Sequence, residues 1–149
     1  IEQKISLNDI VRTGIDIDGI VSNQLLINIF EHNTPLHDGA VVIRGNTIVS
    51  ATCYLPLSDS MRISKDLGTR HRAAIGVSEA TDAVTIVVSE ETGRVSVARA
   101  GRLEVMATPE DLRELLLSLI VYGTESKHFA FNGWNFLKGK EKHEKDNTQ

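Results

Sequence analysis

Cysteine is nearly absent from this sequence, which has one among 149 residues. A single cysteine cannot form a disulfide within the chain, and it excludes a zinc site made of several cysteines. The apolar neighbours of Cys53, in "SATCYLPL", predict a buried thiol in a reducing compartment rather than a reactive nucleophile.

Long apolar runs and an excess of positive charge are also absent. The longest apolar run, "LLLSLIVY" at 115–122, has eight residues, whereas a membrane-spanning helix needs about 20. With 16 basic and 20 acidic residues the net charge is −4, which argues against binding along nucleic acid, so we expect no such partner. The chain starts at Ile1 without a signal-peptide pattern, and we expect it to be cut from a longer protein.

The remaining pattern is that of one α/β domain. Apolar spacing and capping residues predict helices over 6–14, 22–33, 70–80 and 107–123, the last with Thr108 as N-cap. Alternating β-rich runs predict strands over 40–44, 47–55, 82–93 and 94–105, with a hairpin turn at "GN" (45–46). We expect a mixed, largely antiparallel central sheet flanked by helices, followed by a polar, disordered tail.

Cationic residues gather where one of these helices begins, in "GTRHR" (68–72). The first helical turn has unpaired N–H groups that bind anions, Gly68 allows close approach, and Thr69 can cap the helix or donate its hydroxyl. Arg70 and Arg72 oppose the helix dipole, at about 0.3–1 kcal/mol each, which favours a bound anion such as phosphate. Structural ion pairs with nearby carboxylates, such as those of Asp66 or Glu79, are an equal alternative.

Acidic and hydroxyl side chains that could act on a bound phosphate lie in two other segments. In "PLHDGA" (35–40), Asp38 can hold a divalent metal and activate a hydroxyl, with His37 as a further ligand. In "SEETG" (89–93), Ser89 can donate to phosphate and Glu90 or Glu91 can reach a metal. Taken alone, "DG" is an ordinary turn dipeptide and "SEETG" favours a solvated turn.

Tyr54, in "CYLP", is the one aromatic residue that we consider for a base-binding role. Its ring could stack on a nucleobase. Taken alone, however, an aromatic residue at the end of an apolar strand is more typical of the core.

The segments "HDGA" (37–40), "GTRHRAA" (68–74) and "SEETG" (89–93) stand in this order in the chain. Together they resemble the diadenylate cyclase (DAC) domain of bacteria, a family characterised by its Asp-Gly-Ala and Arg-His-Arg motifs. The flanking "NTPLHDGA", "CYLPLS" and "DLGTRHRAAIG" resemble its membrane-anchored, CdaA-like branch. The similarity runs from about residue 14 to 105 and implies the DAC-domain fold.

The resemblance implies that two ATP molecules are joined into cyclic di-AMP with release of two pyrophosphates, across a twofold homodimer in which each protomer holds one ATP. Asp38 would activate the ribose 3′-hydroxyl through a divalent metal (Mn²⁺, Mg²⁺ or Co²⁺), with His37 and Glu91 at that metal. Gly39 would line the ribose, and Tyr54 with Leu55 would enclose the adenine. The residues that would bind or position phosphates are Gly68, Thr69, Arg70, His71, Arg72 and Ser89. The catalytic residues would be Asp38 and Gly39 together with Arg70, His71 and Arg72.

The resemblance also implies boundaries, location and partners. The DAC domain would cover 1–137 and the tail 138–149. The domain would be truncated at its N-terminus, because relatives usually begin with a helix and an edge strand that this chain mostly lacks. CdaA-like relatives carry N-terminal transmembrane helices, so the full-length protein would lie at the cytoplasmic face of the bacterial membrane and this fragment would be soluble. A membrane-anchored regulator protein and phosphoglucosamine mutase are the partners implied.

Two other classes of function compete with an enzyme. A non-catalytic, nucleotide-binding sensor would keep the phosphate site without a group that activates a hydroxyl, and the carboxylate of Asp38 argues against it. A scaffolding module would leave the Arg-His-Arg cluster unexplained. The sequence therefore favours the enzyme.

Overall fold

The computed structural model describes residues 1–61, 63–64 and 67–121. They belong to two compact units, Ile1–Ala107 and a second that begins at Thr108. The predicted tail at 138–149 and the predicted domain end at 137 lie outside the described residues.

The first unit contains a sheet of β1 (Ile15–Ile20), β2 (Ala40–Arg44) and β3 (Thr47–Cys53), in the order β1-β3-β2 and antiparallel throughout. The predicted hairpin turn is confirmed, because Arg44 pairs with Thr47 across residues 45–46. The edge strand β1 was not predicted. Its pairing with β3 is interrupted between Asp16 and Gly19, where Asp18 has a φ of 49°. The predicted first helix is present as α1 (Asn8–Val11), which precedes β1 in the chain.

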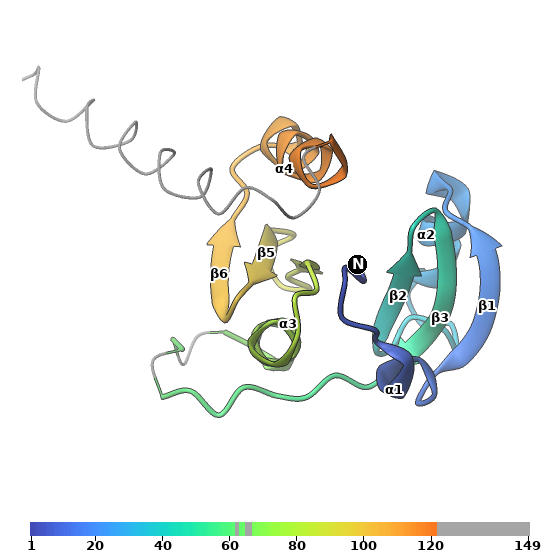
Figure 1. Cartoon of the computed structure of the whole chain (residues 1–149), viewed down its shortest axis with the longest axis horizontal. Coiled ribbons are helices and arrows are strands. Elements are labelled where there is room, and N and C mark those ends of the chain that lie inside the picture. Colours follow the sequence, from blue (N-terminus) through green and yellow to red (C-terminus); the bar gives the residue numbers. More distant parts are fainter. Residues whose placement is uncertain (62, 65–66, 122–149) are drawn as a thin grey trace, which may run out of the picture. The chain divides into compact units, whose positions relative to one another are not determined.

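A second antiparallel sheet consists of β4 (Thr85–Val88), β5 (Val95–Arg99) and β6 (Arg102–Val105), in that order. The predicted α/β class is confirmed, but the sheet is divided into two parts of three strands each. The N-terminal residues lie between the two parts (Figure 1). Ile1 exchanges two backbone hydrogen bonds with Val84, of 2.7 and 3.1 Å, and the Glu2 N–H donates to the Ile43 carbonyl at 2.8 Å.

Local capping explains where the helices begin. In α2 (Asn23–Ile29) the Ser22 hydroxyl accepts from the Leu25 N–H at 3.1 Å. In α4 (Pro109–Val121), which belongs to the second unit, Thr108 and Asp111 cap each other reciprocally at 2.8 and 3.2 Å, as predicted for Thr108. Both α1 and α2 are shorter than expected. No helix within the described ranges is long and apolar enough to cross a bilayer.

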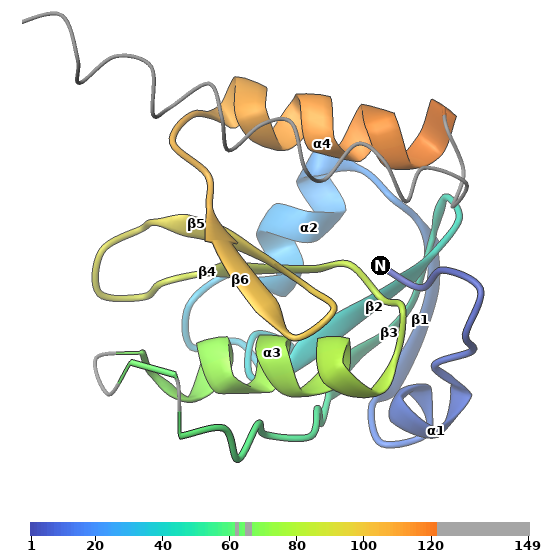
Figure 2. The same cartoon turned by 60° about the vertical axis from the view of Figure 1, so that its left-hand side comes forward.

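Two core clusters of the first unit contain residues of α3 (Thr69–Ala80), which runs along the second sheet (Figure 2), and a further cluster joins Ile29 of α2 to Ile48 and Ala51 of β3. Val77 contacts a cluster with Val42 and Cys53 of the first sheet, whereas Ala74 and Ile75 pack with residues of the second. Cys53 is buried, and burial raises the pKa of its thiol, so the predicted buried thiol is confirmed.

The segment that leads from β3 to α3 crosses that helix at Gly76. A Cβ atom on Gly76 would lie 2.1 Å from the Pro56 carbonyl oxygen and 2.8 Å from the Ser58 nitrogen. Glycine is unfavourable inside a helix by about 1 kcal/mol relative to alanine. The close crossing is the physical reason for this residue here.

Candidate functional site

One half of the candidate site lies where the β2–β3 hairpin opens, and we call it the hairpin half (His37, Asp38, Gly39 and Tyr54). Ala40 at the start of β2 pairs with Cys53 at the end of β3. Because the strands are antiparallel, the residues before Ala40 lie beside those that follow Cys53. The structure thus brings Asp38 and Gly39 next to Tyr54, although they are distant in sequence.

The hairpin half depends on a close approach of two backbones at Gly39. This residue has a φ of +103°, and a Cβ atom on it would lie 2.7 Å from the carbonyl carbon of Thr52. Thr52 itself has a φ of 56°, which is uncommon for a β-branched residue, and the β2–β3 register shifts beside it, between Ala40 and Val42. Such a bulge re-aims the residues next to it. The backbone here therefore requires glycine whatever ligand binds.

Asp38 is exposed, and its carboxylate makes no hydrogen bond or ion pair within the described part of the chain. The half-buried ring of His37, by contrast, is held in place, with Nδ1 2.7 Å from the Thr34 carbonyl oxygen. A carbonyl only accepts, so we assign the proton to Nδ1, which leaves the lone pair of the neutral ring on Nε2. A backbone carbonyl bonded to one ring nitrogen is the usual support of a metal-binding histidine.

Tyr54 is 76% exposed, so its interpretation as a core residue is wrong. Its backbone N–H donates to the Thr13 hydroxyl at 2.9 Å, which fixes the chain while the ring faces solvent. Leu55 is half-buried and packs against the core cluster that contains Cys53. An exposed ring beside a half-buried leucine can enclose a planar ligand.

The other half lies at the start of α3 and in the β4–β5 turn, and we call it the helix half (Gly68–Arg72 with Ser89–Glu91). Gly68 is the N-cap of α3, with φ −71° and ψ 178°, and as a glycine it has no side chain with which to cap the helix. Thr69 is therefore the first helical residue and does not cap, and the first turn has no acidic residue. The N–H groups of this turn remain available to an anion.

The three residues of the Arg-His-Arg motif have different surroundings. Arg70 Nη2 lies 2.8 Å from Glu90 Oε1 in an ion pair, a partner that the sequence analysis did not consider. Arg72 Nη1 makes one long hydrogen bond of 3.5 Å to the Ser58 carbonyl. His71 is 8% exposed and points into the protein.

The ion-pair alternative is thus realised for one arginine with an unforeseen partner. Glu79 does not pair with Arg72, because its carboxylate accepts from the Ser58 hydroxyl at 2.8 Å. Asp66, the other candidate partner, lies outside the described residues. Of the two arginines, Arg72 is the one whose guanidinium has no ion-pair partner among the residues described.

The β4–β5 turn is organised around Ser89. Its N–H donates to the Arg94 carbonyl at 2.9 Å, its carbonyl accepts from Gly93 at 2.8 Å, and its hydroxyl oxygen accepts from the Thr92 N–H at 3.3 Å. The hydroxyl proton remains available for a ligand. Glu90 is engaged with Arg70, whereas Glu91 is exposed and makes no ion pair within the described ranges.

Nowhere in the described part of the chain do three His, Cys, Asp or Glu side chains converge as a metal site. His37, Asp38 and Glu91 thus do not form a complete set of ligands within one chain. An imidazole next to a carboxylate does fit a partial site of the kind that Mg²⁺ and similar ions complete with substrate phosphates and water.

Comparison with known proteins identifies the family. The family model described as DAC, DisA bacterial checkpoint controller nucleotide-binding, matches residues 1–103. The chain belongs to the DAC family. Within it, the cyclic di-AMP synthase CdaA of Bacillus subtilis is 59% identical over 140 residues, which cover 94% of this chain and 50% of that protein.

Two solved structures match the fold of this chain. A double mutant of DacA from Staphylococcus aureus has a TM-score of 0.77 at 52% identity, covering 78% of each chain. A protein described as a hypothetical membrane spanning protein from Bacillus cereus has a TM-score of 0.70 at 47% identity, covering 72% of this chain and 52% of that one. The present chain spans about half the length of its curated relatives.

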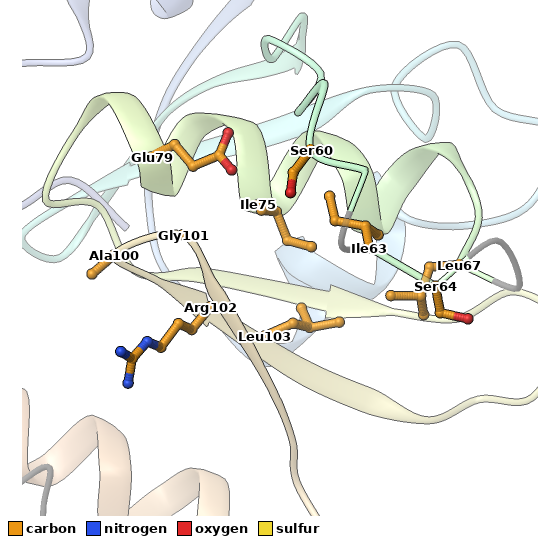
Figure 3. A pocket seen from close by; sticks show the side chains of 10 residues that line it. All are labelled: Ser60, Ile63, Ser64, Leu67, Ile75, Glu79, Ala100, Gly101, Arg102 and Leu103. Atoms are coloured by element: carbon orange, nitrogen blue, oxygen red, sulfur yellow. The ribbon is translucent and has the colours of Figure 1, made fainter.

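The DAC motifs do not line the pocket that lies beside α3 in the first unit. That open pocket, of about 500 Å³, lies between α3, the segment before it and the β5–β6 hairpin (Figure 3). Ile75, Glu79, Arg102 and Leu103 are among the residues that line it, and none of the predicted site residues does. The candidate site, made of the hairpin half and the helix half, therefore lies on the surface of the first unit and not in this cavity.

Two features that support the DAC motifs were not predicted from the sequence, namely the role of Thr34 and the partner of Glu90. Thr34 holds His37 through its carbonyl and closes its own turn by donating its N–H and hydroxyl to the Glu31 carbonyl, at 3.3 and 2.9 Å. A threonine three positions before a histidine is a local signal that could have found it. No local signal indicates that Glu90 faces Arg70, because the two meet only in the folded chain.

Proposed function

We propose that the protein is a diadenylate cyclase, which joins two ATP molecules into cyclic di-AMP and releases two pyrophosphates. In each of two steps a ribose 3′-oxygen forms a bond to an α-phosphorus, the bond from that phosphorus to pyrophosphate breaks, and the hydroxyl proton is lost. The observation that carries the proposal is that Asp38, whose carboxylate has no partner within the described residues, lies at the same open end of the β2–β3 hairpin as the exposed Tyr54, in a chain of the DAC family. The relative CdaA is a cyclic di-AMP synthase by name.

Asp38 would favour loss of the 3′-hydroxyl proton, because a free carboxylate stabilises positive charge that develops next to it. A divalent metal (Mn²⁺, Mg²⁺ or Co²⁺), when bound, would lower the pKa of that hydroxyl and neutralise phosphate charge. His37 Nε2 and the Asp38 carboxylate are the groups that would hold it, with Glu91 as a further ligand.

The helix half would bind the triphosphate. The first-turn N–H groups of α3 and the hydroxyls of Thr69 and Ser89 offer neutral donors, and Arg70 and Arg72 offer charged ones. Gly68 leaves room for a phosphate, since a Cβ atom there would meet nothing within 4 Å. His71 would act by positioning this turn from the buried side, Gly39 would line the ribose, and Tyr54 with Leu55 would enclose the adenine.

Catalysis would need a homodimer, because the chain carries one copy of each motif and the reaction joins two ATP molecules. Each protomer would hold one ATP with its 3′-hydroxyl facing the α-phosphate of the other. Specific activity should therefore fall on dilution through the range in which the dimer dissociates. Activity that stays constant in protein shown by ultracentrifugation to be monomeric would contradict the dimer.

The wider setting is also a proposal. The DAC domain would reach 137, with a polar tail at 138–149. By likeness to a relative described as membrane spanning, the full-length protein would lie at the cytoplasmic face of the bacterial membrane. A membrane-anchored regulator and phosphoglucosamine mutase would be its partners.

The test is incubation with ATP and each of the three metals, followed by identification of the product by mass spectrometry. We expect cyclic di-AMP and two equivalents of pyrophosphate. ATP binding without any product would instead support the nucleotide-binding sensor.

A further inference from the structure

Arg70 and Glu90 form an ion pair that joins two motif segments of the helix half. Arg70 Nη2 lies 2.8 Å from Glu90 Oε1, with the side chains 41% and 59% exposed. Arg70 is the second residue of α3, and Glu90 belongs to the turn between β4 and β5. The proposed function gives Arg70 a role on phosphate and leaves Glu90 without one.

Glu90 is the better anchored of the two partners. Its neighbour Ser89 takes part in three hydrogen bonds across the turn, to Arg94, Gly93 and Thr92. The backbone that carries the Glu90 carboxylate is thereby fixed. Arg70 instead reaches the pair through a long side chain with several rotatable bonds, so the contact restricts Arg70 more than it restricts Glu90.

The pair leaves Arg70 able to bind a further anion. The single contact uses one of the guanidinium's N–H groups, and the others have no acceptor among the described residues and can donate to a ligand. A guanidinium that is already held in place loses less conformational freedom when it binds phosphate. The cost of the arrangement is a carboxylate close to the phosphate site, which on its own would repel a triphosphate.

We propose that Glu90 is a positioning residue, which orients the Arg70 guanidinium toward the phosphates of ATP and touches neither substrate nor metal. This inference rests on the proposed function, since it gives Glu90 a part in the same ATP site. It also separates two adjacent glutamates, because Glu90 acts through Arg70 while Glu91 is the one left for the metal.

The experiment measures binding of α,β-methylene ATP with Mg²⁺ by titration calorimetry, so that no turnover occurs. Glu90→Ala should weaken binding about tenfold, the equivalent of about one charge-assisted hydrogen bond. Glu90→Gln should stay within about threefold of wild type, because its amide oxygen still accepts from Arg70. In an Arg70→Ala background, Glu90→Ala should have no further effect, since coupled residues are not additive.

Two controls separate positioning from a structural role. Asp9→Ala removes the exposed pair, at 3.5 Å, between Asp9 of α1 and Arg12 just after it, and should leave binding unchanged. Without nucleotide, the Glu90 variants should melt within about 3 °C of wild type, because an exposed ion pair contributes little to stability.

Three results would overturn the inference. They are binding by Glu90→Ala that equals or exceeds that of wild type, losses that multiply in the double variant, and wild-type protein that does not bind the analogue. Failure of the proposed function alone looks different. In that case wild type binds the analogue and Glu90→Ala weakens it, but no cyclic di-AMP forms from ATP.

Discussion

The hairpin half and the helix half of the candidate site are specified in different ways. In the hairpin half, Asp38 owes its position to backbone geometry, namely the positive φ of Gly39 and the bulge at Thr52. In the helix half, charged groups matter more. They are the Arg70–Glu90 ion pair and the N-terminus of α3, whose N-cap residue Gly68 has no side chain. A methyl group added at Gly39 should therefore destabilise the hairpin half. In the helix half, changes of side-chain charge should instead alter ATP binding by degrees.

The largest effect should follow from Asp38→Asn. The amide has nearly the same size but lacks the charge that binds metal and favours loss of the hydroxyl proton. We expect ATP affinity within a few-fold of wild type and no detectable cyclisation, measured by calorimetry and by product chromatography. Residual activity above about a tenth of wild type would contradict the role of Asp38, since a positioned base contributes about 10²–10⁴-fold.

A pair of glycine variants tests the contrast between the halves directly. Gly39→Ala forces a Cβ to within 2.7 Å of Thr52 backbone atoms at a φ of +103°, which should lower the free energy of unfolding by about 2–4 kcal/mol. Gly68→Ala, at a φ of −71° with open space around it, should leave the melting temperature unchanged and weaken ATP binding. Equal melting temperatures for the two variants would remove the distinction that we draw.

Arg72→Ala should weaken ATP binding more than it affects the fold. A charge-assisted hydrogen bond contributes about 1.5–3 kcal/mol, or roughly ten- to a hundredfold in affinity. Because Arg72 has no ion-pair partner among the described residues and opposes the helix dipole, the free protein should melt at the same or a slightly higher temperature. Thermal melts with and without ATP check this. A variant that melts several degrees lower, yet gains as much from ATP as wild type, would assign Arg72 to the fold.

The smallest effect concerns an ion pair outside both halves. Arg44 donates to both carboxylate oxygens of Glu2, at 2.6 and 2.8 Å, and this bonding lowers the pKa of Glu2. A carboxyl whose pKa is lower in the folded state contributes stability above its unfolded pKa and loses it as the pH falls through the folded value. Glu2→Gln should therefore melt a few degrees lower at pH 7, and the difference should vanish in acid. A difference that is independent of pH would show that packing, not charge, is responsible.

The features that the sequence predicted correctly are local ones. The Thr108 cap, the turn at 45–46 and the start of α3 near Thr69 depend on residues within a few positions of one another. The edge strand β1 escaped prediction because "IDIDGI" contains residues that are depleted in strands. Its pairing with β3 comes from the rest of the fold, and it is interrupted at the bulge near Asp18.

The same distinction applies to the site. The sequence motifs predicted which residues form the site. The partners and the exposure of these residues depend on tertiary structure, as the Arg70–Glu90 ion pair and the exposed Tyr54 show. Tyr54 was misjudged because an apolar strand ordinarily ends inside the core. Here the strand passes through the bulge at Thr52 and carries the ring out to solvent.

The crossing at Gly76 has a consequence for how the site opens. The segment from Tyr54 to Ser58 belongs to the hairpin half at one end, and at the other the Ser58 N–H donates to the Arg72 carbonyl of α3 at 3.0 Å. With no side chain between segment and helix, neither can move far without the other. Amide hydrogen exchange at Tyr54, Ser58 and the first turns of α3 should accordingly share one opening free energy, so that both halves are lost as a single cooperative unit.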